Sequence, residues 1–196
     1  MSMNDWWKEQ HDLQLREPAF WRIWVQKHFR SADLIWHAYA AACSKFMADP
    51  EAYDMDPDRP LNDDRDLSTI AFFHLAIALE LVVKGHLVRG DPQIVEKNDF
   101  YTHDLESLCA RIHMQLSESE MYLVKQLRHL VEWHGRYPTP RHKNPNAWER
   151  VPDAEGRDNM PGRIAPDDYQ RVRKLIEKVD QHAQQNWVPS SRTINE

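Results

Sequence analysis

The residues best suited to chemistry lie together in the stretch LRHLVEWHGRYPTPRHK, residues 127–143. Between positions 125 and 143 the chain has five basic residues, at 125, 128, 136, 141 and 143, and a single acid, Glu132. This segment therefore has a formal charge of +4, and since the whole chain has −6, the remaining residues sum to −10. Such a polarised charge predicts either an anion-binding site or a basic arm that pairs with acidic segments of the same chain.

Arg128 and His134 are the pair in this stretch that could act together on a substrate. Six residues of α-helix separate two positions by about 9 Å along the axis and by about 120° around it. On one straight helix the pair does not converge, so a shared substrate requires an early helix end or a second protomer with its own pair. Taken alone, Arg128 is expected to pair with Glu132 four residues later. His134 would then interact favourably with the dipole of the helix end.

A second polar pair, Glu80 and Lys84, lies within the most apolar segment of the chain. The four-residue spacing puts both side chains on one face of a helix, where they form either a buried ion pair or part of a catalytic site. Eleven histidines raise the question of a metal ion, but the Glu-x-x-His pattern of di-metal helical bundles does not occur in the sequence. We therefore expect neither a metal site nor a cofactor.

Twelve prolines and only five glycines determine where helices can form. The prolines leave four long windows, at 19–49, 61–91, 93–137 and 167–188, and proline disrupts helix interiors. The scarcity of glycine also argues against the turns of a β-sandwich or of a nucleotide-binding sheet. The sequence predicts an all-α fold, an up-and-down bundle of about five helices with a long irregular segment before the last helix.

Apolar periodicity places the first two helices. A long amphipathic helix begins at Pro18 and occupies the first window, and Ser31 marks a candidate break within it. A second helix, apolar on most of its circumference, is expected over about 67–88 and should lie in the centre of the bundle.

Capping residues place the other three helices. A short third helix is capped by Thr102 or Asp104, and a fourth begins with a capping box of Ser117 and Glu120. Gly135 is expected to end this fourth helix, and a fifth starts near residue 165. We expect one helical domain over residues 1–188, in which 136–165 form an irregular basic arm, followed by a tail over 189–196. Trp6 and Trp7 are expected in a loose N-terminal segment that docks onto the body or a partner.

Composition excludes several classes of protein. The apolar fraction of 41% and the charged fraction of 29% are typical of soluble globular proteins, and the net charge of −6 does not attract nucleic acid or anionic membranes as a whole. No signal peptide is recognisable at the N-terminus. The apolar run from Ile70 to Val88 contains charged residues, so we interpret it as a buried helix and not as a membrane span. Cys43 and Cys109 form no ligand-spaced pair, and a cytoplasmic location is expected.

Over about residues 19–134 the chain resembles the HEPN superfamily. The resemblance is carried by a long first helix, a central helix with ALELVVKGHL (78–87), an HDL junction (103–105) and Arg-x5-His at Arg128 and His134. Glu80 and Lys84 stand where such families often have a glutamate and a lysine, and His129 stands where the commoner pattern has Asn or Asp. The GRYP segment (135–138) is similar to uncharacterised bacterial proteins of this general type.

The resemblance implies a metal-independent endoribonuclease of a phage-defence, abortive-infection or toxin–antitoxin system. In that reading His134 transfers a proton at the ribose 2′-hydroxyl or the leaving oxygen, and Arg128 stabilises charge on the phosphorus. RNA would be bound by a substrate-binding set made up of Arg136, Tyr137, Arg141 and Lys143. The implied partners are a second copy of the chain, RNA, and an antitoxin or other protein. The alternative is a non-catalytic module that binds a protein or an anionic ligand.

Overall fold

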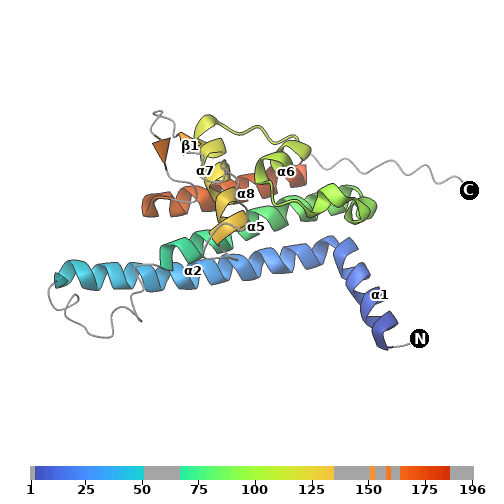
Figure 1. Cartoon of the computed structure of the whole chain (residues 1–196), viewed down its shortest axis with the longest axis horizontal. Coiled ribbons are helices and arrows are strands. Elements are labelled where there is room, and N and C mark those ends of the chain that lie inside the picture. The colour runs from blue at the N-terminus through green and yellow to red at the C-terminus, as the bar shows by residue number, and fades with distance from the viewer. Residues whose placement is uncertain (1–2, 51–66, 135–150, 153–157, 160–163, 186–196) are drawn as a thin grey trace, which may run out of the picture.

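The computed structural model describes residues 3–50, 67–134, 151–152, 158–159 and 164–185. Within these ranges the chain is built almost entirely of helices (Figure 1). The predicted all-α class is confirmed, whereas the specific helix arrangement of the HEPN superfamily remains a prediction. Most of the expected basic arm at 136–165 and all of the expected tail at 189–196 lie outside the described residues.

The chain begins with two helices at an angle to each other, α1 (Met3–Arg16) and α2 (Pro18–Ala48) (Figure 1). Pro18 occupies the first turn of α2, as predicted, and the side chain of Glu17 accepts a hydrogen bond from the backbone of Ala19. The expected break near Ser31 is wrong, because α2 is continuous over 31 residues. The N-terminal segment that was expected to be loose forms α1, on which Trp6 and Trp7 are exposed, and their docking onto a partner stays a prediction.

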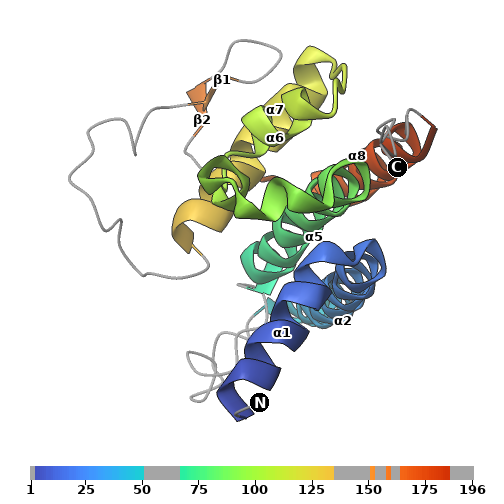
Figure 2. The same ribbon diagram turned by 90° about the vertical axis from the view of Figure 1, so that its right-hand side faces the viewer.

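Helix α5 (Leu67–Gly90) is the central element of the molecule. Figure 2 shows it between α2 on one side and α6 and α7 on the other, with α8 alongside. Eleven of its residues are buried, including Glu80 and Lys84. By length and composition alone α5 could span a membrane, but 56% of its most apolar window is buried inside the protein. A central position accounts for that composition.

Two short 3₁₀ segments, η2 (Pro92–Glu96) and η3 (Asn98–Tyr101), lead from α5 to α6 (Leu105–Arg111). The side chain of Asp104 caps α6 by accepting a hydrogen bond from the backbone of Ser107. Helix α7 (Glu118–His129) begins with the predicted capping box of Ser117 and Glu120. It continues as a π-helical turn, η4 (Leu130–His134), which the sequence did not predict.

The remaining elements are a short strand pair and the last helix. β1 (Val151–Pro152) and β2 (Asp158–Asn159) form an antiparallel pair of two residues each. A 3₁₀ turn, η6 (Pro166–Asp168), precedes α8 (Tyr169–Gln185).

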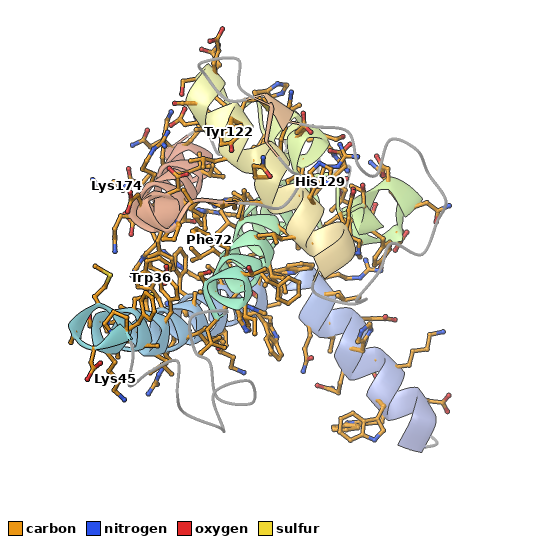
Figure 3. The ribbon with its side chains drawn as sticks, turned by 60° about the vertical axis from the view of Figure 1, so that its left-hand side comes forward. Trp36, Lys45, Phe72, Tyr122, His129 and Lys174 are labelled. Atoms are coloured by element: carbon orange, nitrogen blue, oxygen red, sulfur yellow. The ribbon has the colours of Figure 1, made fainter. Side chains whose placement is uncertain are left out.

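Aromatic packing joins α2, α5 and the start of α8. Trp36 of α2 stacks on Tyr169 with ring centroids 4.0 Å apart, and Phe72 of α5 meets both rings edge-on at 5.9 Å. Figure 3 shows Trp36 and Phe72 next to each other at this junction. The Tyr169 hydroxyl donates to Asp33 of α2 at 2.8 Å. These contacts fix the position of α8 along α2 and α5.

Candidate functional site

Three carboxylates surround the predicted catalytic arginine. Nε of Arg128 donates to Glu132 at 2.8 Å, so the pairing predicted along α7 is confirmed. Nη1 lies 3.3 Å from a carboxylate oxygen of Glu106 and 3.6 Å from one of Asp104. Burial alone would lower the pKa of Arg128, but the three acids raise it, so the guanidinium keeps its charge.

These contacts define what Arg128 can do. Asp104 caps α6 and Glu106 lies in its first turn, so Arg128 ties α7 to the start of α6. A phosphate that bound Arg128 would have to compete with carboxylates already in place and would be repelled by them. The described surroundings of Arg128 therefore favour a structural role between the two helices.

A second network lies where α5 meets the start of α6. Nζ of Lys84 donates to Glu80 at 2.6 Å, and Nδ1 of His103 donates to the other carboxylate oxygen at 3.0 Å. Glu80 and Lys84 are buried, and the ammonium lies 5.5 Å from the ring centre of Phe100. The pair predicted on the central helix is therefore a buried ion pair, and His103 of the HDL junction is a third member of it.

The charge of Glu80 depends on these two partners. Burial alone would raise the pKa of Glu80, but the hydrogen bond from His103 and the charge of Lys84 outweigh it and lower the pKa. The carboxylate is thus ionised at neutral pH and compensated on both oxygens. One third of the His103 side chain is exposed, so this network reaches the surface at the histidine.

The π-helical turn changes the relation between Arg128 and His134. A π turn advances by less than the 100° per residue of an α-helix, because its hydrogen bonds span five residues instead of four. Over η4 the smaller rotation per residue increases the angle between Arg128 and His134 beyond about 120°, so the two positions come closer to opposite sides of the helix axis. Within one chain the pair is therefore farther from convergence than a straight α-helix would place it.

The rest of the predicted substrate site cannot be placed. Gly135, Arg136, Tyr137, Arg141 and Lys143 lie outside the described residues, as does the side chain of His134. His129 is partly buried at the end of α7, where Figure 3 shows it on the helix carrying Arg128.

A cavity of about 510 Å³ lies elsewhere, between α2, α5 and α8. Its walls are mostly apolar and include Trp21, Val25 and Phe29 from α2 and Ile176 from α8. Trp21 is held in place because its indole N–H donates to the backbone carbonyl of Leu15 at 2.9 Å. Cavities of this size with apolar walls are typical of small-molecule sites.

Polar groups from all three helices reach the same cavity. Nε2 of His86 on α5 donates to Asp180 on α8 at 3.0 Å, and Gln184 donates to the second carboxylate oxygen at 2.7 Å. The hydrogen bond from His86 lowers the pKa of Asp180, as do the charges of His86 and Arg22, although burial opposes them. Asp180 is therefore ionised, and Arg22 and Gln26 are exposed at the cavity rim.

No pattern in the sequence predicts this cavity. His86 and Asp180 are 94 residues apart, and neither belongs to a local pattern that indicates a site. The one available signal was Gly85 inside an otherwise apolar helix, because such a glycine often marks the close approach of another element. A Cβ atom at Gly85 would lie 2.9 Å from Cβ of Trp21.

Among the described residues, no group of three or more His, Cys, Asp or Glu side chains could hold a metal ion. The chain matches no protein-family model. Neither a curated protein nor a solved structure is similar enough to it to count as a relative.

Proposed function

We propose that this chain is a helical module that binds a small molecule with an apolar body in the cavity between α2, α5 and α8. The observation that carries the proposal is the cavity of about 510 Å³, whose apolar walls carry the hydrogen-bonded pair of His86 and Asp180. A preformed apolar cavity with a few convergent polar groups is the usual form of a ligand site. This function is non-catalytic, like the alternative in the sequence analysis, but that alternative names a protein or an anionic ligand and stays a separate prediction.

The comparison with Arg128 supports this choice. Arg128 is engaged by three carboxylates, whereas Arg22 at the cavity forms no ion pair or hydrogen bond with any residue that the structure describes. The polar groups at the cavity also come from three helices that the aromatic junction holds together. A site built on packed helices keeps its geometry when it is empty.

Saturation-transfer NMR with a panel of small aromatic probes tests the proposal. The panel is L-phenylalanine, 3-phenylpropionate, 2-phenylethylamine and 3-phenylpropanamide, which share a phenyl body. We expect transfer to at least one probe and its loss in Gln26→Trp, which places a large ring at the rim of the cavity. Arg30→Trp is the matched control, because Arg30 is exposed on the same helix and does not line the cavity.

Two results would overturn the proposal. One is the absence of transfer to every probe in the panel. The other is equal transfer in Gln26→Trp and in the parent, because binding would then take place outside the cavity. Equal circular dichroism of parent and variants shows that the fold is retained.

The metal-independent ribonuclease remains a second proposal. One observation favours it: π-helical turns are rare and often occur at functional sites, and η4 begins two residues after Arg128 and ends at His134. Because the two positions do not converge within one chain, this function requires a homodimer in which each protomer supplies one member of the pair.

Incubation of the purified protein with labelled RNA in the presence of a chelator tests the second proposal. A ribonuclease of this kind leaves a cyclic phosphate on the product, and His134→Ala should abolish cleavage. His11→Ala is the control, since His11 is exposed on α1. If the parent leaves RNA intact, or if His134→Ala cleaves as fast as the parent, this function is excluded.

A further inference from the structure

Opposite charges line different sides of the cavity. α2 and α5 contribute two guanidinium groups, Arg22 and Arg89, and α8 contributes two carboxylates, Glu177 and Asp180. His86 donates to Asp180 and fixes the position of that carboxylate. The two guanidinium groups on α2 and α5 and the two carboxylates on α8 balance in charge, and the charge of Arg22 reaches Asp180 and lowers its pKa.

This separation discriminates between ligands by charge. A ligand with one charge gains from one side of the cavity and meets a like charge on the other. A ligand with both charges gains from both sides when its anion faces α2 and α5 and its cation faces α8. Neither Arg22 nor Glu177 forms an ion pair or hydrogen bond with another residue in the described part of the chain, although the charge of Arg22 lowers the pKa of Asp180.

The apolar side chains that line the cavity indicate what the uncharged part of the ligand should be. Trp21 is fixed by its hydrogen bond to Leu15 and by an edge-on contact with Phe100, and Phe29 and Val25 extend the same apolar wall along α2. Aromatic rings favour apolar bodies, especially other rings, over water. An apolar side chain on a zwitterionic head matches both the walls and the charges.

We propose that the ligand is a zwitterion of the apolar α-amino acid class, an inference that rests on the proposed ligand-binding function. Its carboxylate interacts with Arg22, and its ammonium lies between Glu177 and Asp180. Its side chain packs against Trp21 and Phe29.

The four probes of the panel separate this inference from the proposed function. 3-Phenylpropionate lacks the ammonium of L-phenylalanine, 2-phenylethylamine lacks the carboxylate, and 3-phenylpropanamide has neither charge. We expect L-phenylalanine to bind about tenfold more tightly than either singly charged probe, which corresponds to one charge-assisted contact at a solvated site. Dissociation constants from NMR titration give the comparison.

Two charge-neutralising variants assign the contacts. Arg22→Gln should weaken the binding of L-phenylalanine and of 3-phenylpropionate. The binding of 2-phenylethylamine should stay the same or become tighter. Glu177→Gln should weaken the binding of L-phenylalanine and of 2-phenylethylamine and leave the binding of 3-phenylpropionate unchanged. The matched controls are Arg30→Gln and Glu118→Gln, which make the same charge changes at exposed positions outside the cavity.

The outcomes are distinguishable. If the uncharged amide or a singly charged probe binds as tightly as L-phenylalanine, and Gln26→Trp still blocks it, the cavity binds small molecules but the zwitterion inference is wrong. If Arg22→Gln weakens all four probes equally, the carboxylate assignment is wrong. If no probe binds, the proposed function fails together with the inference.

Discussion

At the scale of single residues, the surroundings of a side chain decide the role that a motif only suggests. Arg128 fits the Arg-x5-His spacing, yet Glu132, Glu106 and Asp104 neutralise its charge. Gln126, two residues earlier on the same helix, belongs to no motif, yet it is fully buried and its two side-chain polar atoms have no hydrogen-bond partner in the described part of the chain.

We predict that Gln126→Met stabilises the protein. A buried amide without hydrogen bonds costs about 1–3 kcal/mol, and methionine fills a similar volume without polar atoms. The free energy of unfolding should rise by about 1–2 kcal/mol in urea denaturation. Gln170→Met is the control, because Gln170 is exposed and its replacement should change stability by less than about 0.5 kcal/mol. A loss of stability in Gln126→Met would show that the amide has a partner in solution.

A pair of histidines between α2 and α5 gives a prediction about pH. Nδ1 of His28 lies 3.0 Å from Nδ1 of His74, so one ring donates to the other. Burial lowers the pKa of both histidines, and the charge of His74 further lowers that of His28. A lowered pKa means that the folded state resists protonation. The contribution of the pair to stability is therefore complete above about pH 6.5, the pKa in the unfolded chain, and is lost as pH falls through the folded value.

The midpoint of thermal unfolding should accordingly fall between pH 7 and pH 5, and His74→Gln should reduce that fall. Carboxylates with a lowered pKa, such as Glu80 and Asp180, become protonated only below about pH 4.5. Their titration therefore does not change the unfolding midpoint between pH 7 and pH 5. His11→Gln is the control on an exposed histidine. An equal fall in the parent and in His74→Gln would contradict the prediction.

At the scale of helices, local sequence rules predicted most of what the structure shows. Pro18, Asp104 and the Ser117–Glu120 box began helices where expected, because capping depends on neighbouring residues only. The π turn after α7 was missed, since an α pattern and a π turn use the same residues until tertiary packing selects between them. The approach of α2 to Gly85 was likewise a tertiary event that periodicity does not encode.

We predict that Gly85→Ala destabilises the protein although alanine is the better helix former. The added Cβ would lie 2.9 Å from Cβ of Trp21, which its bond to Leu15 and its contact with Phe100 keep from moving away. Overpacking costs about 1–3 kcal/mol, which exceeds the gain of about 1 kcal/mol in helix propensity. Gly90→Ala is the matched control on the same helix, because its Cβ meets nothing within 4 Å. If both variants unfold at the same urea concentration, α2 and α5 are not constrained at Gly85.

At the scale of the whole molecule, the sequence predicted the all-α class and the central place of α5, but not the cavity. The fold class follows from where prolines and apolar residues occur along the chain. The cavity instead requires the relative position of three helices, and its defining pair of His86 and Asp180 spans 94 residues. Likewise, no spacing rule could assign Asp104 and Glu106 of one helix to Arg128 of another.

The sequence predicts a homodimer that pairs the helices carrying Arg128 and His134, whereas the structure offers a different interface, on α2. Phe20, Ile23, Trp24 and Leu34 are exposed on α2. At 100° and 1.5 Å per residue, these four residues lie within about 100° of the helix circumference and over about 21 Å of its length. A helix face of this kind is self-complementary about a two-fold axis, and pairing would remove its apolar side chains from water.

Light scattering at tens of micromolar should therefore give the mass of two chains, and Leu34→Glu should shift the equilibrium to the monomer by placing a charge inside the interface. Met47→Glu is the matched control, since Met47 is exposed on the same helix about 180° from Phe20. A monomeric parent would contradict the dimer. A dimer that both variants leave intact would exclude the α2 face and would direct attention to the end of α7, where the second-protomer ribonuclease requires the contact.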